Sequence, residues 1–259
     1  MLLLDLDARP IVGHRGAPRY APENTLESFR VALAQGAEAL ELDVRASREG
    51  EAVVLHDATL DRTTDLSGPV GRYTTAELAR ADAGYRFTPD RGRTRPYRGR
   101  GIRIPTLREV LHAFPHTPLI VEVKEIAVQG DVARALVEAD AARRVIVSGE
   151  DWRALRAFER EPFRRGAARR EIARFYFGGL LGLAPRTPPY GNLSVPIRFR
   201  GLPVPTRRFV RQARERGITV HVWTVDRPAT ALALWRRGVN GILTNAPDRI
   251  RSARAALGR

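Results

Sequence analysis

The chain has 259 residues, a formal net charge of +15 and no cysteine. Its length suits one α/β barrel or two smaller domains, and we expect a single domain over residues 1–259. Without cysteine, disulfides, thiolate zinc sites and cysteine nucleophiles are excluded. Residues 1–10 hold a short leucine run interrupted by Asp5 and Asp7, which is neither a signal peptide nor a membrane span, so a cytoplasmic location is expected.

The first quarter of the chain alternates short apolar runs with an amphipathic segment. We expect strands near residues 11–14, 37–44 and 52–56, and a helix over 26–35 that Gly36 ends. Each strand contains or ends in polar groups that can perform chemistry. This part of the sequence therefore predicts both a sheet and a site.

Residues 58–104 interrupt this pattern. They contain the turn Ser67-Gly68-Pro69 and the run R-G-R-T-R-P-Y-R-G-R-G-I-R, which has no apolar periodicity. A loop of this length inside a compact domain is usually functional or disordered. We interpret it as a small insertion after the third strand, and we expect it to cover the mouth of the fold as a lid.

The alternation of strands and helices then resumes, and Thr106 with Glu109 predicts a capping box at the start of a helix. Further strands are expected at residues 119–124, 144–148, 163–167, 192–196, 218–224 and 241–244. Alternating strands and helices favour a parallel sheet with helical crossovers, and the number of units favours a (β/α)8 TIM barrel. Because this gives one strand too many, we expect residues 163–167 or 192–196 to be a loop.

Three carboxylates stand near the ends of two predicted strands. Glu41 and Asp43 share one strand face, because side chains on a strand alternate, and Glu122 lies on a later strand. Clustered carboxylates are costly unless positive charge lies beside them. An oxygen-rich site favours Mg²⁺ or Ca²⁺ over zinc, with Mn²⁺ also possible. The alternative is that these acids pair with nearby arginines.

Two histidines and two cations are expected beside the carboxylates. His14 and His56 follow predicted strands and suit a general acid and base pair, because imidazole titrates near neutral pH. Lys124, the only lysine in the chain, shares a strand face with Glu122. Together with Arg15 it offers positive charge where a phosphodiester develops negative charge during cleavage.

The ordered motifs H-R-G, P-E-N-T, E-L-D, H-D-x-x-L-D-R-T-T, P-T-L-x-E-V-L, E-V-K and V-W-T-V resemble the bacterial glycerophosphodiester phosphodiesterases. The resemblance implies a phosphodiesterase-type TIM barrel that releases glycerol 3-phosphate and an alcohol from a small glycerophosphodiester. By position, it implies a metal held by Glu41, Asp43 and Glu122, acid and base roles for His14 and His56, and substrate binding by Arg15, Lys124, Asn24 and Trp223.

The sequence departs from this family near its end, where Asn240 and Asn245 stand at positions that are often aspartate. This departure concerns residues that would support the site, because the expected metal ligands lie elsewhere in the sequence. Two other functions stay open: a lysophospholipase D-type enzyme acting on lipids, and a non-catalytic basic barrel that binds acidic polymers or membranes. Because the arginine runs lack regularly interleaved aromatic residues, we expect general attraction of anionic substrates and no nucleic-acid binding.

Overall fold

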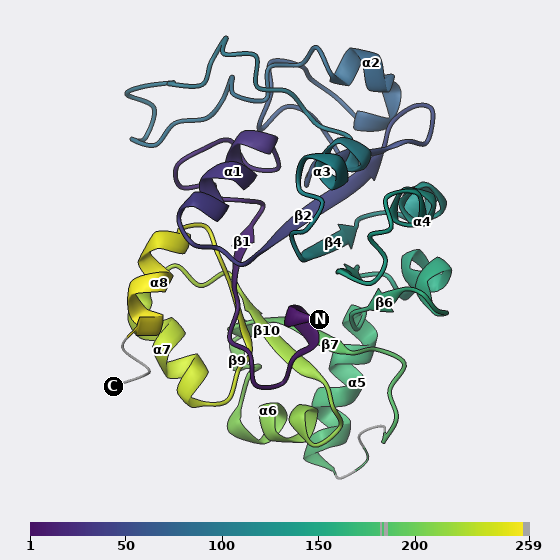
Figure 1. The fold of residues 1–259 in the computed structure, drawn as a ribbon, viewed down its shortest axis with the longest axis vertical. Helices are drawn as coiled ribbons and strands as arrows, with labels where there is room; N and C mark the ends of the chain where they lie inside the picture. The colour runs from purple at the N-terminus through teal and green to yellow at the C-terminus, as the bar shows by residue number, and fades with distance from the viewer. Residues whose placement is uncertain (182, 184–185, 256–259) are drawn as a thin grey trace.

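The computed structural model describes residues 1–181, 183 and 186–255, and it has a barrel of parallel strands surrounded by helices (Figure 1). Hydrogen-bonded neighbours in the sheet follow the order β6, β5, β4, β2, β1, β11, β10 and β7. The barrel strands are β1 (Ile11–His14), β2 (Ala39–Ala46), β4 (Leu119–Val123), β5 (Val145–Ser148), β6 (Arg164–Arg165), β7 (Asn192–Pro196), β10 (Thr219–Trp223) and β11 (Gly241–Thr244).

Backbone contacts next to β6 close the barrel. A parallel bridge joins Gly166 to Asn192 at the start of β7. The Ala167 N–H donates to the Asn192 carbonyl at 2.8 Å, and the Gly191 N–H donates to the Arg165 carbonyl at 3.1 Å. All eight strands therefore join in one parallel barrel, as the TIM-barrel prediction requires.

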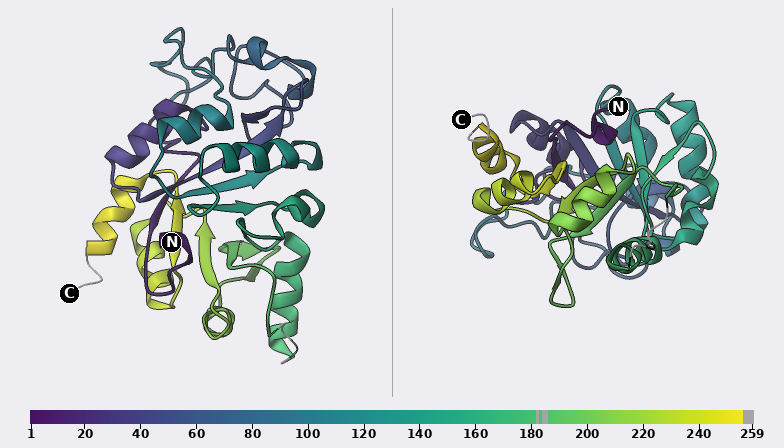
Figure 2. Two further views of the ribbon diagram at one scale, coloured as in Figure 1. Left: turned by 45° about the vertical axis from the view of Figure 1, so that its right-hand side comes forward. Right: turned by 90° about the horizontal axis from the view of Figure 1, so that it is seen from below.

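Helices pack around this barrel and connect its strands (Figures 1 and 2). The α-helices are α1 (Leu26–Ala34), α2 (Thr75–Leu78), α3 (Leu107–Ala113), α4 (Gln129–Glu138), α5 (Arg169–Leu180), α6 (Arg207–Arg214), α7 (Pro228–Arg236) and α8 (Pro247–Ala255). Shorter 3-10 segments are η1 (Leu2–Leu4), η2 (Val70–Arg72), η3 (Ile126–Val128) and η4 (Trp152–Phe158). The predicted capping box of α3 is present, since Thr106 accepts from the Glu109 N–H and Glu109 accepts from the Thr106 N–H.

The surplus strand of the sequence prediction is β3 (Ala52–Val54), and both weak candidates belong to the barrel. β3 pairs antiparallel with β2, with Val54 beside Val44, and lies outside the closed ring. The expectation of a loop at 163–167 or 192–196 was wrong. β6 joins the ring through backbone pairing over only two residues, so it needs no apolar run that a sequence pattern could reveal.

The insertion follows β3, the third strand along the chain, and precedes α3. It contains η2 and α2 and forms one end of the molecule in Figure 1. Its apolar side chains, including Leu60, Val70 and Leu78, pack in a buried cluster that also takes in Val53 of β3. The segment therefore has a core of its own despite its lack of sequence periodicity.

Side chains on β2 separate cleanly between the two faces of the sheet. Leu40, Leu42 and Val44 are buried in the core between barrel and helices, whereas Glu41 and Asp43 point inward.

At the N-terminal end of the barrel strands, Leu3 of η1 closes the barrel interior. It packs in a buried cluster with Val12, Ala39, Ile120, Ile146 and Leu243.

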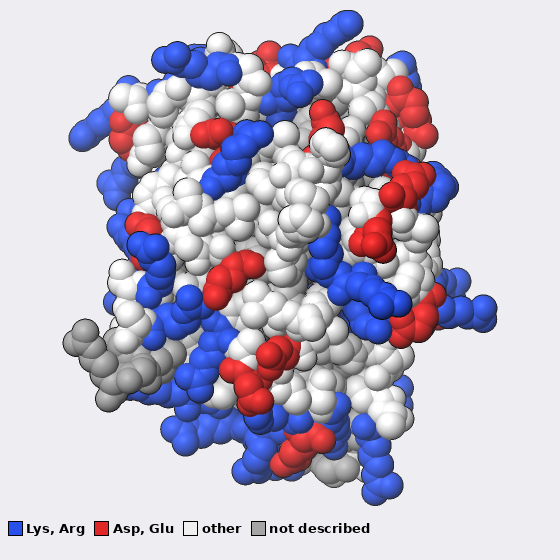
Figure 3. Space-filling view, in the orientation of Figure 1, with Lys and Arg blue, Asp and Glu red and all other residues white. Residues whose placement is uncertain are grey.

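Charge is spread over the surface around the N-terminal end of the barrel. In Figure 3, arginine and acidic side chains are interspersed on this face. Many of them pair, as Arg214 does with Asp7 at 2.6 Å. None of the described helices is long and apolar enough to cross a lipid bilayer.

Leu3 should contribute strongly to stability, because it fills the barrel end and is fully buried. Leu3→Ala is expected to lower the free energy of unfolding by about 2–5 kcal/mol, the usual range for deleting a buried leucine side chain. Leu180→Ala, which removes a half-exposed leucine at the end of α5, should change it by less than about 0.5 kcal/mol. Urea unfolding measures both, and equal values would contradict the role of Leu3.

Candidate functional site

An acidic cluster lies on the inner side of β2 and β4. Asp43 and Glu122 are register partners on these neighbouring strands, and Glu41 precedes Asp43 on the same face. One oxygen from each of the three carboxylates lies within 4.8 Å of the other two. Glu41 and Asp43 are buried, and the Glu122 side chain is 25% exposed. Strand alternation and strand pairing thus bring three predicted residues together.

Lys124 follows β4 directly and contacts two of these carboxylates. Its Nζ lies 2.7 Å from Asp43 Oδ1 and 2.8 Å from Glu122 Oε1. Lys124 therefore offsets the charge of Asp43 and Glu122 from one position, while the carboxylate oxygens of the cluster are of the kind that hard cations prefer as ligands.

The turn after β1 places Arg15 against the cluster. Arg15 and Gly16 have φ values of 52° and 89°. A Cβ on Gly16 would lie 2.3 Å from Ser28 Oγ, so this position requires glycine. The Arg15 N–H donates to Glu41 Oε2 at 2.9 Å, and its Nε lies 3.2 Å from Asp43 Oδ2. The H-R-G motif therefore supplies both a backbone donor and a cation.

Asn24 holds Asp43 in place from the other side. Its Nδ2 donates to Asp43 Oδ2 at 2.9 Å, and its Oδ1 accepts from the Asp43 N–H at 3.3 Å. Asn24 itself is buried with φ of 57°, and its N–H donates to the Arg15 carbonyl at 3.0 Å. The amide thus fixes the orientation of the most buried carboxylate in the site.

Burial and neighbouring charge shift the pKa values of the three carboxyl groups. Burial, followed by the charges of Asp43 and Glu122, raises the pKa of Glu41 well above its usual range. Burial also raises the pKa of Glu122, although Lys124 opposes it. Burial opposes ionisation of Asp43 too, but Lys124 and Arg15 together lower its pKa. The cluster holds one carboxylate more than these two cations offset, so its donor set fits a divalent cation.

His14 is held by a chain of polar groups. Its Nδ1 lies 2.9 Å from Asn245 Oδ1, and Asn245 donates to Asp226 from Nδ2 at 3.0 Å and from its N–H at 2.8 Å. Because a carboxylate only accepts, Asp226 orients the amide so that its oxygen faces His14. His14 Nδ1 therefore donates its hydrogen to Asn245 Oδ1. In the neutral ring the lone pair is then on Nε2, which lies 4.0 Å from Glu41 Oε2. Burial, followed by the charge of Arg15, lowers the pKa of His14.

His56 follows β3 and not a barrel strand, which corrects its expected position. The antiparallel pairing of β3 with β2 still brings it close, because the Leu55 N–H donates to the Asp43 carbonyl at 3.0 Å. His56 Nδ1 lies 2.6 Å from Asp57 Oδ1, and the imidazole side chain is 34% exposed.

A second polar network ties the insertion to the site. Arg62 of the insertion donates to Asp57 at 2.5 Å and to both oxygens of Glu23 at 2.7 and 2.8 Å. Glu23 in turn accepts from Arg15 at 3.0 Å. Hydrogen bonding from Arg62, with a further contribution from His56, lowers the pKa of Asp57 to about 2. The insertion is therefore linked to Arg15 and His56 through ion pairs.

Sequence reasoning missed three of these residues, Glu23, Arg62 and Asp226, and gave Asn245 only as a departure that concerns support around the site. Glu23 stands within the P-E-N-T motif and Arg62 within D-R-T-T, so both were visible in motifs but had no assigned partner. Asn245 directly follows β11. Because TIM-barrel sites are built at the C-terminal ends of the strands, this position indicates a residue close to the site. Asp226 lies beyond the end of β10, and no pattern linked it to His14.

Trp223 is less closely connected to the cluster. It ends β10 beside Pro196 of β7 and is 39% exposed, and among the described residues it makes no hydrogen bond or ion pair to the acidic cluster. His221, two residues earlier, is fully buried inside the barrel. Burial lowers its pKa to about 4.

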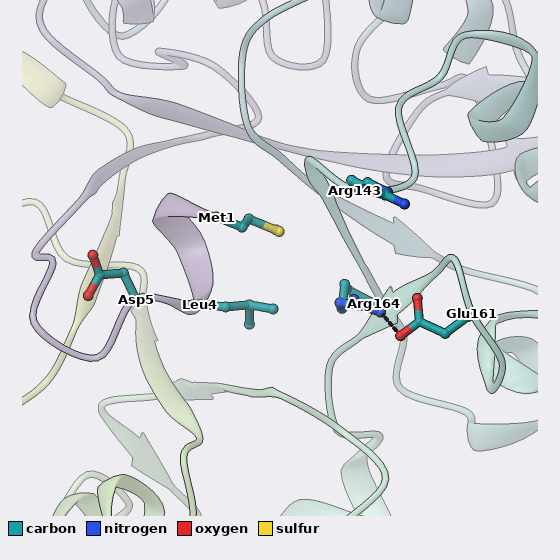
Figure 4. Close-up of a pocket in the computed structure, with 6 residues that line it drawn as sticks. All are labelled: Met1, Leu4, Asp5, Arg143, Glu161 and Arg164. Atoms are coloured by element: carbon teal, nitrogen blue, oxygen red, sulfur yellow. Dashed lines mark hydrogen bonds and ion pairs between the residues drawn. The ribbon is translucent and has the colours of Figure 1, made fainter.

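A cavity of about 630 Å³ lies outside the acidic cluster (Figure 4). Its lining residues are Met1, Leu4, Asp5, Arg143, Glu161 and Arg164. Arg143 precedes β5 and Arg164 begins β6, so this cavity opens at the N-terminal end of the strands. It is separate from the acidic cluster, which stands nearer the C-terminal ends, where TIM-barrel sites are built.

The sequence profile of the glycerophosphoryl diester phosphodiesterase family matches residues 14–249. A Caldanaerobacter subterraneus subsp. tengcongensis protein named glycerophosphodiester phosphodiesterase is 30% identical over 248 residues, covering 92% of this chain and 94% of that protein. The glycerophosphoryl diester phosphodiesterase domain of a Mycobacterium tuberculosis protein has a TM-score of 0.86 at 25% identity, covering 96% of this chain and 100% of that chain. An Oleispira antarctica phosphodiesterase, solved with the product sn-glycerol-3-phosphate, has a TM-score of 0.75 at 26% identity, covering 96% and 97%. This chain therefore belongs to the glycerophosphoryl diester phosphodiesterase family.

Proposed function

We propose that the protein hydrolyses glycerophosphodiesters to glycerol 3-phosphate and an alcohol at the acidic cluster. The observation that carries this proposal is the convergence of Glu41, Asp43 and Glu122, with His14 beside Glu41 and with His56 directly after the residue that bonds the Asp43 backbone, in a member of this family. The related Oleispira enzyme was solved with sn-glycerol-3-phosphate, which supports this product class.

Glu41, Asp43 and Glu122 would hold a divalent cation, with Mg²⁺ or Ca²⁺ preferred and Mn²⁺ possible. Their oxygen donors suit hard cations, and the pKa of Glu41 is raised by burial and by the negative charge of Asp43 and Glu122, which a cation would offset. When bound, such a cation supplies positive charge against the phosphate. Arg15 and Lys124 add fixed positive charge at the same place, where they would bind phosphate oxygens.

The two histidines have environments that suit opposite roles. The Asn245 contact leaves Nε2 of His14 unprotonated, and burial favours its neutral form, as a general base requires. Asp57, 2.6 Å from Nδ1 of His56, fixes the orientation of the imidazole, and the ring is 34% exposed, so it can reach a leaving group as a general acid requires. His14 would take the proton from the attacking hydroxyl, and His56 would give one to the leaving alkoxide.

Asn24, Trp223 and the insertion would complete the site. Asn24 keeps Asp43 oriented toward Lys124, and Trp223 would form a wall of the glycerol pocket at the end of β10. Residues 58–104 would act as a lid that limits substrate size. The ion pairs from Arg62 to Glu23 and Asp57 support this assignment, since they fasten the insertion beside Arg15 and His56.

EDTA should abolish hydrolysis, and one of Mg²⁺, Ca²⁺ or Mn²⁺ should restore it. Binding can also be measured without turnover, because an ion at 100 times its Kd stabilises the folded state by about 2.7 kcal/mol and raises Tm. Glu122→Gln should weaken this rise, whereas Glu215→Gln, at the exposed residue that follows α6, should not. Full activity in exhaustively chelated protein would rule out the cation site.

His14→Ala and His56→Ala should each lower kcat by about 10²- to 10⁴-fold, the range for a positioned acid or base. Both variants should keep the cation-induced rise in Tm. A substrate with a p-nitrophenol leaving group needs little protonation, so it should rescue His56→Ala and not His14→Ala. His116→Ala, at an exposed histidine, is the matched control.

Two results would contradict this scheme. Near-wild-type turnover of an unactivated glycerophosphodiester in either histidine variant would remove acid–base catalysis by the pair. Rescue of His14→Ala in place of His56→Ala would reverse the assigned roles.

Arg62→Ala should loosen the insertion, because it removes the ion pairs to Glu23 and Asp57. We expect faster amide hydrogen exchange across residues 58–104 and a relative gain in kcat/KM for bulky head groups over small ones. Arg80→Ala, in the same insertion but exposed, is the control. Unchanged exchange together with unchanged size selectivity would contradict the lid.

A further inference from the structure

Large apolar side chains are exposed along one side of the barrel mouth. Five of them, 37% to 51% exposed, lie at or after the C-terminal ends of barrel strands. Ile126 follows β4, Trp152 follows β5, Phe199 and Leu202 follow β7, and Trp223 ends β10. These strands, with β6 between β5 and β7, are consecutive around the barrel. We call these five residues the apolar rim.

Contacts between neighbouring loops make the rim continuous. The Ala157 N–H of η4 donates to Gln129 beside η3, which joins the Trp152 segment to the Ile126 segment. The Arg169 N–H donates to the Glu150 carbonyl at 3.1 Å, and the Arg169 guanidinium lies 5.1 Å from the Phe199 ring. The segments after β4, β5, β6 and β7 therefore contact one another in sequence.

A hairpin forms the most prominent part of this rim. β8 (Arg198–Phe199) and β9 (Leu202–Pro203) are joined by Arg200 and Gly201, whose φ values of 48° and 85° give a tight two-residue turn. Phe199 and Leu202 are direct cross-strand partners, so their exposed side chains lie on one face of the hairpin. In the right-hand view of Figure 2 this green hairpin extends from the body on the side opposite the N-terminus.

Arginines lie among the rim side chains. Arg156 stacks over Trp152 at 4.3 Å, and Arg169 and Arg200 lie 5.1 and 5.6 Å from the Phe199 ring. Aromatic side chains are favoured at the headgroup level of bilayers, and arginine forms strong contacts with phosphate. The net charge of +15 adds attraction toward an anionic surface.

From this combination we propose that the apolar rim docks on an anionic lipid bilayer, with the β8–β9 hairpin inserted among the headgroups. Charge complementarity favours this partner: apolar tips on separate loops reach the interface, and the arginines between them meet lipid phosphates. Docking turns the barrel mouth toward the membrane. The proposal goes beyond the hydrolytic function and does not require it.

Cosedimentation with vesicles tests this directly. Wild-type protein should bind vesicles of phosphatidylcholine mixed with phosphatidylglycerol, bind phosphatidylcholine alone more weakly, and dissociate as salt rises. Phe199→Ser with Leu202→Ser should weaken binding by about tenfold or more, since two apolar side chains are removed from the interface. Hydrolysis of a small water-soluble glycerophosphodiester should not change, and circular dichroism should confirm the fold.

The matched control is Val137→Ser with Leu180→Ser, two exposed apolar residues at the C-terminal ends of α4 and α5. Because the helices of a barrel run back from its mouth, these ends lie at the other end of the barrel. These changes should leave vesicle binding intact. The proposal is overturned if wild-type protein does not bind anionic vesicles, or if the control pair abolishes binding while the hairpin pair does not. Because binding is measured without substrate, an inactive protein that still binds would contradict only the hydrolytic proposal.

Discussion

The burial of the Asp43 carboxylate is the constraint on which the rest of the site depends. Its side chain has no exposed surface, and an unpaired charge in such a place would destabilise the fold by several kcal/mol. Lys124, Arg15 and Asn24 surround it, and the two cations keep its pKa low in spite of burial. Lys124 follows β4, whereas Arg15 and Asn24 lie in the loop between β1 and α1, so compensation of this one charge draws both segments to β2.

The same constraint accounts for backbone features that otherwise appear unrelated. Arg15, Gly16 and Asn24 all have positive φ, and two of these residues contact Asp43 directly. Gly16 allows the chain to pass against Ser28, so that the preceding arginine can turn its N–H toward Glu41. Conformations that are unfavourable for ordinary residues are thus stabilised by the charged site that they help to build.

Much of this arrangement could be predicted from sequence, because it follows from local rules. Alternation on a strand puts Glu41 and Asp43 together, and parallel pairing brings Glu122 beside them. The position of His56 could not be predicted, since β3 reads like any other strand and only its antiparallel pairing removes it from the barrel. The link from His14 through Asn245 to Asp226 joins distant residues, and no local pattern encodes it.

The two halves of the mouth differ in the interactions that they make. On the β2 side Arg62 of the insertion is bound to Glu23 and Asp57, which gives this side a polar wall. On the side from β4 to β10 the loops expose apolar tips with arginines beside them, as Arg169 lies beside Phe199 and also pairs with Glu150. A cation–π contact at the surface is weak, about 0.5–1 kcal/mol, so these side chains can exchange it for a stronger partner without disturbing the fold. The polar wall therefore holds Arg15 and His56 through its ion pairs, and the apolar rim, which makes no such ion pairs to the acidic cluster among the described residues, is left for the second surface that we propose.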